Sequence, residues 1–132
     1  MTNLMACIRG EGIRGMVRFS CRDGGVLVTA EIFGLRDGFH GFHIHEGFDC
    51  GGAGFSNTGG HYGTGAHPDH AGDLPPLLSC GGRAFLSART DRFRLQEILG
   101  RTVVIHSLPD DFCTQPAGNS GEKIACGRII SC

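Results

Sequence analysis

The chain has 132 residues and a mass of 14.0 kDa, so we expect one domain, residues 1–132, with one modest core. Twelve Lys and Arg residues nearly balance 13 Asp and Glu residues, and no basic run argues for a nucleic-acid partner. No apolar stretch approaches the roughly 20 residues of a membrane-spanning helix, and the first ten residues carry no export signal. We therefore expect no membrane partner and a cytoplasmic location, although an exported protein trimmed of its leader would give the same pattern.

Three residue counts stand out: 23 Gly, 7 Cys and 7 His. That much glycine without a Gly-x-y repeat indicates many turns and loops, which suits an antiparallel β protein better than a helical one. Seven cysteines cannot all pair within one chain, so at least one stays free or pairs with another molecule.

Short apolar or alternating runs recur between glycines and polar residues, and we interpret them as strands of a sandwich or barrel. A hairpin turn is expected at Asp23-Gly24-Gly25. The segment 91–99 mixes charged and apolar residues at either period, and we interpret it as a strand with a turn. The expected strands are residues 4–8, 15–21, 26–33, 39–45, 83–88, 102–106 and 124–130.

Two segments do not fit the strand pattern, roughly residues 47–82 and 107–121, and both are dense in Gly, Pro, His, Asp and Cys. A structureless loop longer than about 15 residues is uncommon in a compact domain and is usually functional or disordered. The first loop holds three histidines and the second an Asp pair, so we expect both loops to be functional.

His43 and His45 flank Ile44 on a predicted strand. Residues two apart on a strand point to the same face, about 6.6 Å apart along the axis, so the two histidines can converge on one ion. His40 has the other parity, and we interpret it as a structural or hydrogen-bonding histidine. On its own, such a His-x-His pair is more often two surface or packed histidines.

Further candidate ligands favour a metal site over an ordinary pair of packed or surface histidines. His61, His67, His70 and Asp73 lie in the first loop, and His106 ends an apolar run. Neutral imidazole suits copper and zinc, and nitrogen ligands with one carboxylate fit zinc without excluding other divalent ions. The alternative is a histidine-rich, solvated loop with incidental metal affinity.

Five motifs follow one another along the chain: GFHIHE (41–46), NTGGHY (57–62), HAGDL (70–74), VVIHSLPDD (103–111) and GNSGEKIACG (118–127). In this order they resemble the copper/zinc superoxide dismutase family, and the resemblance extends from about residue 8 to residue 130. The resemblance implies an all-β, eight-stranded Greek-key barrel or sandwich with two long functional loops. It also implies an oxidoreductase that disproportionates superoxide to dioxygen and hydrogen peroxide by cycling between Cu(II) and Cu(I).

The resemblance further implies a copper site and a zinc site that share His61 as a bridging and catalytic residue. Asp110 matches a carboxylate that accepts hydrogen bonds from one copper histidine and one zinc histidine, here His43 and His67; its alternative is an ordinary turn Asp. The interval from His61 to His70 is much shorter than the family usually shows. Of the implied zinc ligands, His67 is the one whose assignment depends most on this interval. The implied ligands are His43, His45, His61 and His106 for copper, and His61, His67, His70 and Asp73 for zinc.

Lys123 lies where the family usually places an Arg that draws in the anionic substrate. Lysine keeps the charge but loses the planar fork of two parallel donors, so we expect a weaker or less oriented dock; the alternative is an exposed Lys near a strand start. The second loop is also short, and Pro116 replaces a Lys that family members often carry, so we expect reduced electrostatic steering.

Cys50 and Cys126 match the family disulfide. The other five cysteines have no family role, and those in strands are expected to be small buried hydrophobes. They are Cys7, Cys21, Cys80, Cys113 and Cys132.

The main alternative function is a copper- and zinc-binding or copper-delivery protein on the same fold with little turnover. Such a protein would lack the bridging histidine, a copper ligand or the guiding cation. A copper-only dismutase would lack the zinc ligands, which His70 and Asp73 argue against, and a structural sandwich would leave the grouped histidines unexplained. Superoxide is the implied substrate; a homodimer and a copper chaperone as partners are left open.

Overall fold

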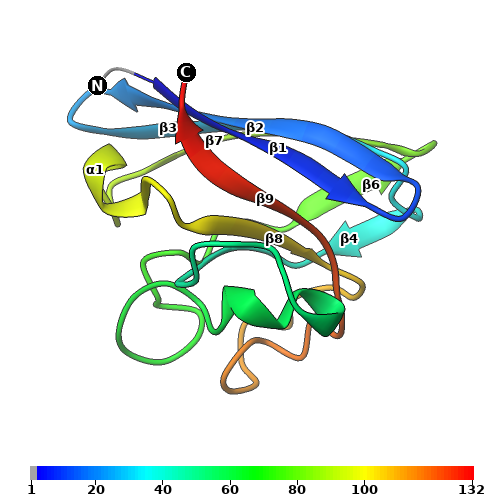
Figure 1. The fold of residues 1–132 in the computed structure, drawn as a ribbon. Coiled ribbons are helices and arrows are strands. Elements are labelled where there is room, and N and C mark those ends of the chain that lie inside the picture. Colours follow the sequence, from blue (N-terminus) through cyan, green and yellow to red (C-terminus); the bar gives the residue numbers. More distant parts are fainter. Residues whose placement is uncertain (1–2) are drawn as a thin grey trace.

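Nine antiparallel strands form one sheet that curls into a nearly closed barrel in the computed structural model, which describes residues 3–132 (Figure 1). The spatial order is β4-β6-β7-β3-β2-β1-β9-β8-β5, and β4 and β5, at its two ends, are joined in the chain by Gly41 alone. The strands are β1 (Asn3–Gly10), β2 (Ile13–Arg22), β3 (Gly25–Phe33), β4 (Gly38–His40), β5 (Phe42–His45), β6 (Leu77–Cys80), β7 (Arg83–Thr90), β8 (Thr102–His106) and β9 (Lys123–Ser131).

The core follows from the two-residue period of the strands. In β1, Leu4, Ala6 and Ile8 are fully buried while the residues between them face outward. In β5, by contrast, all four residues are buried. Phe42 and Ile44 belong to the hydrophobic core, so the two histidines that alternate with them lie on the outer face of the strand, where the loops cover them.

Most strand predictions are confirmed, as is the turn after β2, where Asp23 and Gly24 have φ values of 49° and 79°. The count of eight strands is corrected to nine. The expected strand 39–45 is divided at Gly41, whose carbonyl accepts the His106 N–H at 2.9 Å. A further strand, β6, lies inside the first expected loop because Leu77 and Ser79 alternate inward.

The expected strand at 91–99 is wrong, because this segment contains a short helix, α1 (Leu95–Ile98). Leu95 and Ile98 are both buried, and residues three apart share a face only in a helix. The Glu97 carboxylate accepts the Arg94 N–H at 2.8 Å and so caps the first turn.

Cys50 and Cys126 form a disulfide that ties the first loop to β9 across a sequence separation of 76. The expectation that cysteines in strands are buried is wrong, because Cys7, Cys21 and Cys80 are all exposed. Parity places Cys7 and Cys80 on the outer face of the barrel, whereas Cys21 has the inward parity of β2 but lies at the exposed end of that strand. Among residues 3–132, no helix has the length and apolar character needed to cross a membrane.

Removing the disulfide should destabilise the protein. In the chain-entropy model a loop of this length gives up to about 4.5 kcal/mol, and we expect the Cys50→Ser/Cys126→Ser variant to lose about 2–4 kcal/mol of unfolding free energy in non-reducing urea titrations. Cys80→Ser, at an exposed free cysteine, is the matched control and should be unchanged. Equal stability of the double variant and the wild type would contradict the prediction.

Candidate metal centre

The first long loop is held to β5 by backbone hydrogen bonds that resemble a short extra strand pair. Tyr62 N–H donates to the Ile44 carbonyl, and Ile44 N–H donates to the Gly72 carbonyl, both at 2.8 Å. A Cβ atom on Gly72 would lie 2.3 Å from the Ile44 oxygen, so only glycine allows this approach. The pairing brings His61 opposite His45 and Asp73 opposite His43.

One group of four histidines gathers at this junction. His43 and His45 come from β5, His61 from the loop and His106 from the end of β8, and each offers one ring nitrogen within 4.8 Å of the others. All four are buried. The Nε2 atoms of His45 and His106 lie 3.4 Å apart. We call these four residues the four-histidine group.

The second ring nitrogen of each histidine in this group has a fixed partner. His43 Nε2–H donates to Asp110 Oδ2 at 2.8 Å, and His45 Nδ1–H donates to the Gly59 carbonyl at 2.8 Å. His106 Nδ1 lies 3.4 Å from the Gly121 oxygen, and His61 Nδ1 lies 2.7 Å from Asp73 Oδ1. Partners of this kind set the ring orientation and leave the opposite nitrogen of each ring for an ion.

Asp73 is the centre of a second group. Its Oδ2 atom lies 3.2 Å from His67 Nδ1 and 3.0 Å from His70 Nδ1, while its Oδ1 atom faces His61. His43 also lies within 4.8 Å of His61, His67 and Asp73 through one ring nitrogen, but it already belongs to the four-histidine group. Because His70 contacts Asp73 directly, we call His61, His67, His70 and Asp73 the Asp73 group.

Four ring nitrogens test whether metal ions fit these groups. Within residues 3–132, His43 Nδ1, His61 Nε2, His67 Nδ1 and His70 Nδ1 are buried and make no hydrogen bond, although the last two lie near Asp73 Oδ2. A buried polar atom without a hydrogen bond costs about 1–3 kcal/mol, so four such atoms in one place call for a partner. Four imidazoles suit copper, and three imidazoles with one carboxylate suit zinc. The donor atoms of both groups fit these cations.

Asp110 lies between the two groups. Its Oδ1 accepts His67 Nε2–H at 2.7 Å, in addition to the His43 bond to Oδ2. Burial by itself raises the pKa of Asp110, but these two hydrogen bonds and that from Phe112 N–H outweigh it and hold the pKa well below its usual value. Gly118, at φ 73°, packs so closely that a Cβ there would lie 2.2 Å from Asp110 Oδ1.

Three histidines of the four-histidine group, His43, His45 and His106, are held neutral. Burial, which outweighs the hydrogen bond to Gly59, lowers the pKa of His45 to about 2, and burial likewise lowers the pKa of His106 to about 3. Burial also lowers the pKa of His43. Because neutral imidazole is the form that binds metals, these side chains are ready to act as ligands at neutral pH.

Lys123 lies at the start of β9, and its Nζ donates to Thr58 Oγ1 and to the Gly59 carbonyl, both at 2.8 Å. The same carbonyl orients His45. Thr58 is fully buried at the end of the short 3₁₀ segment η1 (Ala53–Thr58), and its hydroxyl donates to the Phe55 carbonyl at 2.8 Å. The sequence analysis missed Thr58, because a threonine before a glycine pair carries no signal of this contact.

His40 does not join either group. Its Nδ1 lies 2.9 Å from the His106 carbonyl oxygen and its Nε2 lies 2.7 Å from the Arg36 carbonyl oxygen. The expectation of a hydrogen-bonding rather than ligating role for His40 is confirmed.

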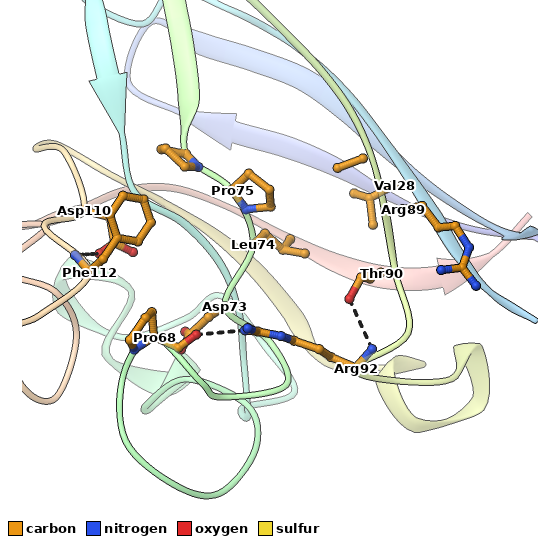
Figure 2. Close-up of a pocket in the computed structure, with 12 residues that line it drawn as sticks. Val28, Pro68, Asp73, Leu74, Pro75, Arg89, Thr90, Arg92, Asp110 and Phe112 are labelled. Atoms are coloured by element: carbon orange, nitrogen blue, oxygen red, sulfur yellow. Dashed lines mark hydrogen bonds between the residues drawn. The ribbon is translucent and has the colours of Figure 1, made fainter.

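Beside the Asp73 group lies a cavity of about 410 Å³ (Figure 2). Asp73, Asp110 and Pro68 line one side, and Arg92 reaches across from the segment after β7 to donate to the Pro68 carbonyl at 2.8 Å. No residue of the four-histidine group lines it. The cavity therefore lies outside the place where an ion would meet those histidines.

Comparisons with known proteins agree with this geometry. The family model described as copper/zinc superoxide dismutase matches residues 13–129. Superoxide dismutase [Cu-Zn] of Legionella pneumophila is 36% identical, over 87% of this chain and 76% of that protein. Superoxide dismutase [Cu-Zn] A of Xenopus laevis is 35% identical, over 100% of this chain and 99% of that protein.

Among solved structures, the clock protein EA4 superposes with a TM-score of 0.86 at 33% identity, covering 97% of this chain and 93% of that one. The family match and these relatives extend over most of the chain. The chain therefore belongs to the copper/zinc superoxide dismutase family.

Proposed function

We propose that the protein is a superoxide dismutase that converts two superoxide anions into dioxygen and hydrogen peroxide. The observation that carries this proposal is the sharing of His61 by two adjoining donor groups with four unpaired buried nitrogens. Copper, when bound, supplies one-electron chemistry by alternating between Cu(II) and Cu(I), while zinc keeps one oxidation state.

The ligand assignment follows from the free nitrogen of each ring. His43, His45, His61 and His106 would hold copper, and His61, His67, His70 and Asp73 would hold zinc. For His45 and His43 the nitrogen opposite the copper side is bound by Gly59 and Asp110 respectively, so neither ring can turn away without breaking a buried hydrogen bond. His67, despite the short loop interval, lies within reach of Asp73.

His61 is the residue that the chain can use to move a proton. Its Nδ1 is turned to Asp73 and its Nε2, buried and unpaired, is turned to the four-histidine group. We assign to His61 Nε2 the proton that is held between the two half-reactions and then passed to peroxide. The Asp73 contact keeps the ring in place during this transfer.

Lys123 provides the positive charge that attracts the substrate. Its Nζ donates to the same Gly59 carbonyl that accepts His45 Nδ1–H, so the ammonium lies beside the four-histidine group. Two of its three N–H donors bind Thr58 and Gly59, so one remains for an anion. Thr58 thus gives the lysine a second anchor, in place of the planar fork of an arginine.

Reloading with metals tests the enzyme assignment. We expect metal-free protein to leave the spontaneous decay of superoxide unchanged, and protein reloaded with copper and zinc to accelerate it in proportion to bound copper, followed by stopped-flow absorbance. Copper bound at one equivalent without accelerated decay would contradict the assignment and leave a copper-handling protein.

Replacing Asp110 tests the link between the two groups. In Asp110→Asn one amide N–H would face a ring N–H of His43 or His67, so we expect zinc affinity to fall about 10–100-fold in calorimetric titrations. Asp111→Asn is the matched control, because Asp111 is exposed and bonds to backbone N–H groups of Cys113 and Thr114. Equal zinc affinities for the two variants would remove Asp110 from the site.

A double-mutant cycle tests the anchored lysine. We expect Lys123→Ala to lower kcat/KM about tenfold and to flatten its salt dependence, because the anion is no longer attracted. Thr58→Val keeps the shape and the charge but removes one of the two anchors of the ammonium, and leaves the bond to the Gly59 carbonyl. We therefore expect a smaller loss of kcat/KM than in Lys123→Ala, with the salt dependence retained. In the double variant the two losses should not add, because Thr58 acts through Lys123. Additive losses, or a salt profile unaltered in Lys123→Ala, would count against this role.

A further inference from the structure

One outer face of the barrel is crowded with arginines. It is formed by the outward side chains of five consecutive strands, β9, β1, β2, β3 and β7, and we call it the arginine face. It carries seven of the 12 basic residues of the chain, all exposed, and only Glu31 of the 13 acidic ones. The arginines are Arg9, Arg14, Arg18, Arg22, Arg83, Arg89 and Arg128.

The strand register produces this face. The arginines are scattered along the sequence and form no basic run, but strand pairing brings them together. Arg9 is paired with Arg14, which is paired with Phe33, which is paired with Arg83, so one row across four strands carries three arginines and a phenylalanine. Directly paired residues point to the same face of a sheet. Along β2, arginines recur every four residues, about 13 Å apart. The positive charge therefore extends in two dimensions over the sheet.

Most of this charge is not neutralised by neighbours. Among the described residues, only Arg83 has an ion-pair partner on the face, Glu31. Arg14 stacks over the Phe33 ring at 5.0 Å. Arg18 and Arg22 have side chains with no hydrogen bond or ion pair in the described part of the chain. Two other acidic residues, Glu11 and Asp23, lie in the turns at the strand ends and not on the face.

Apolar side chains stand among the arginines. Phe85 is 60% exposed and Ile130 is 43% exposed, and Met5 and Met16 are partly exposed between them and the basic rows. A face of cations with interspersed apolar groups matches the boundary of a lipid bilayer, where charged headgroups meet acyl chains. Such binding lies along the surface and needs no membrane-spanning helix.

We propose that the arginine face docks the protein onto anionic lipid bilayers. A bilayer presents phosphate and carboxylate groups in two dimensions, as the arginines are arranged, whereas a nucleic-acid strand would need one linear track. The rest of the molecule holds five basic and 12 acidic residues, so it is repelled by the same surface and the docked orientation is fixed. The two long loops lie on the other side of the barrel from β1 and β2 (Figure 1), so these loops face away from a bilayer docked on the arginine face.

Vesicle sedimentation tests this docking without any measurement of activity. We expect the full-length protein to bind phosphatidylserine/phosphatidylcholine vesicles and not pure phosphatidylcholine vesicles, with affinity that falls as salt rises. Each arginine near an anionic surface contributes about fivefold in affinity, so Arg18→Gln/Arg22→Gln should bind roughly 25-fold more weakly. The control, Arg36→Gln/Arg94→Gln, makes the same change in net charge at exposed arginines off the face, and should bind like the wild type.

Three results would overturn the proposal. They are absence of wild-type binding to the anionic vesicles at low salt, an equal loss of affinity in the two double variants, and tighter binding of a single-stranded oligonucleotide than of the vesicles. Thermal melting of each variant shows whether it is folded, so a loss of binding can be assigned to the face itself. The readout depends neither on metal nor on turnover, so its failure leaves the proposed function untouched.

Discussion

The backbone pairing of Ile44 with Tyr62 and Gly72 is the interaction on which the rest of the site depends. Ile44 itself is buried in the core, so the strand that carries His43 and His45 cannot move without disturbing the barrel. The pairing then fixes an irregular, glycine-rich loop to that strand. An otherwise mobile segment gains the positional accuracy of a β-sheet, which a constellation of metal ligands requires.

Two carboxylates, Asp73 and Asp110, also fix the positions of the histidine rings, in different ways. Asp73 contacts three rings and so gathers a set of donors, whereas Asp110 binds one ring from each set on the side opposite its free nitrogen. The first arrangement brings ligands together and the second prevents them from turning. Their combined effect is a rigid, buried pair of sites in which the fold tolerates unpaired nitrogens that an ordinary core would avoid.

Sequence patterns predicted the strands well where burial alternates, as in β1 and β3, and predicted the ligand candidates because histidine clusters are rare. They failed at α1, where four residues are too few to show a period, and at β6, where two prolines and a short apolar run resemble a loop. Thr58 and the arginine face could not be found, because both depend on register and on contacts between distant segments. Cytoplasmic location stays a prediction, and the homodimer and the copper chaperone, which the sequence analysis left open, stay open.

The disulfide and the Lys123 contacts have a mechanical consequence in common. Cys126 and Lys123 lie three residues apart on β9, and their partners, Cys50 and Thr58, bracket the segment that contains η1. A segment fastened to a strand at one point can pivot about it, but a segment fastened at both ends cannot. The two attachments therefore prevent this segment from rotating relative to β9. The Gly59 carbonyl at its end is held in place, and this carbonyl orients both His45 and Lys123.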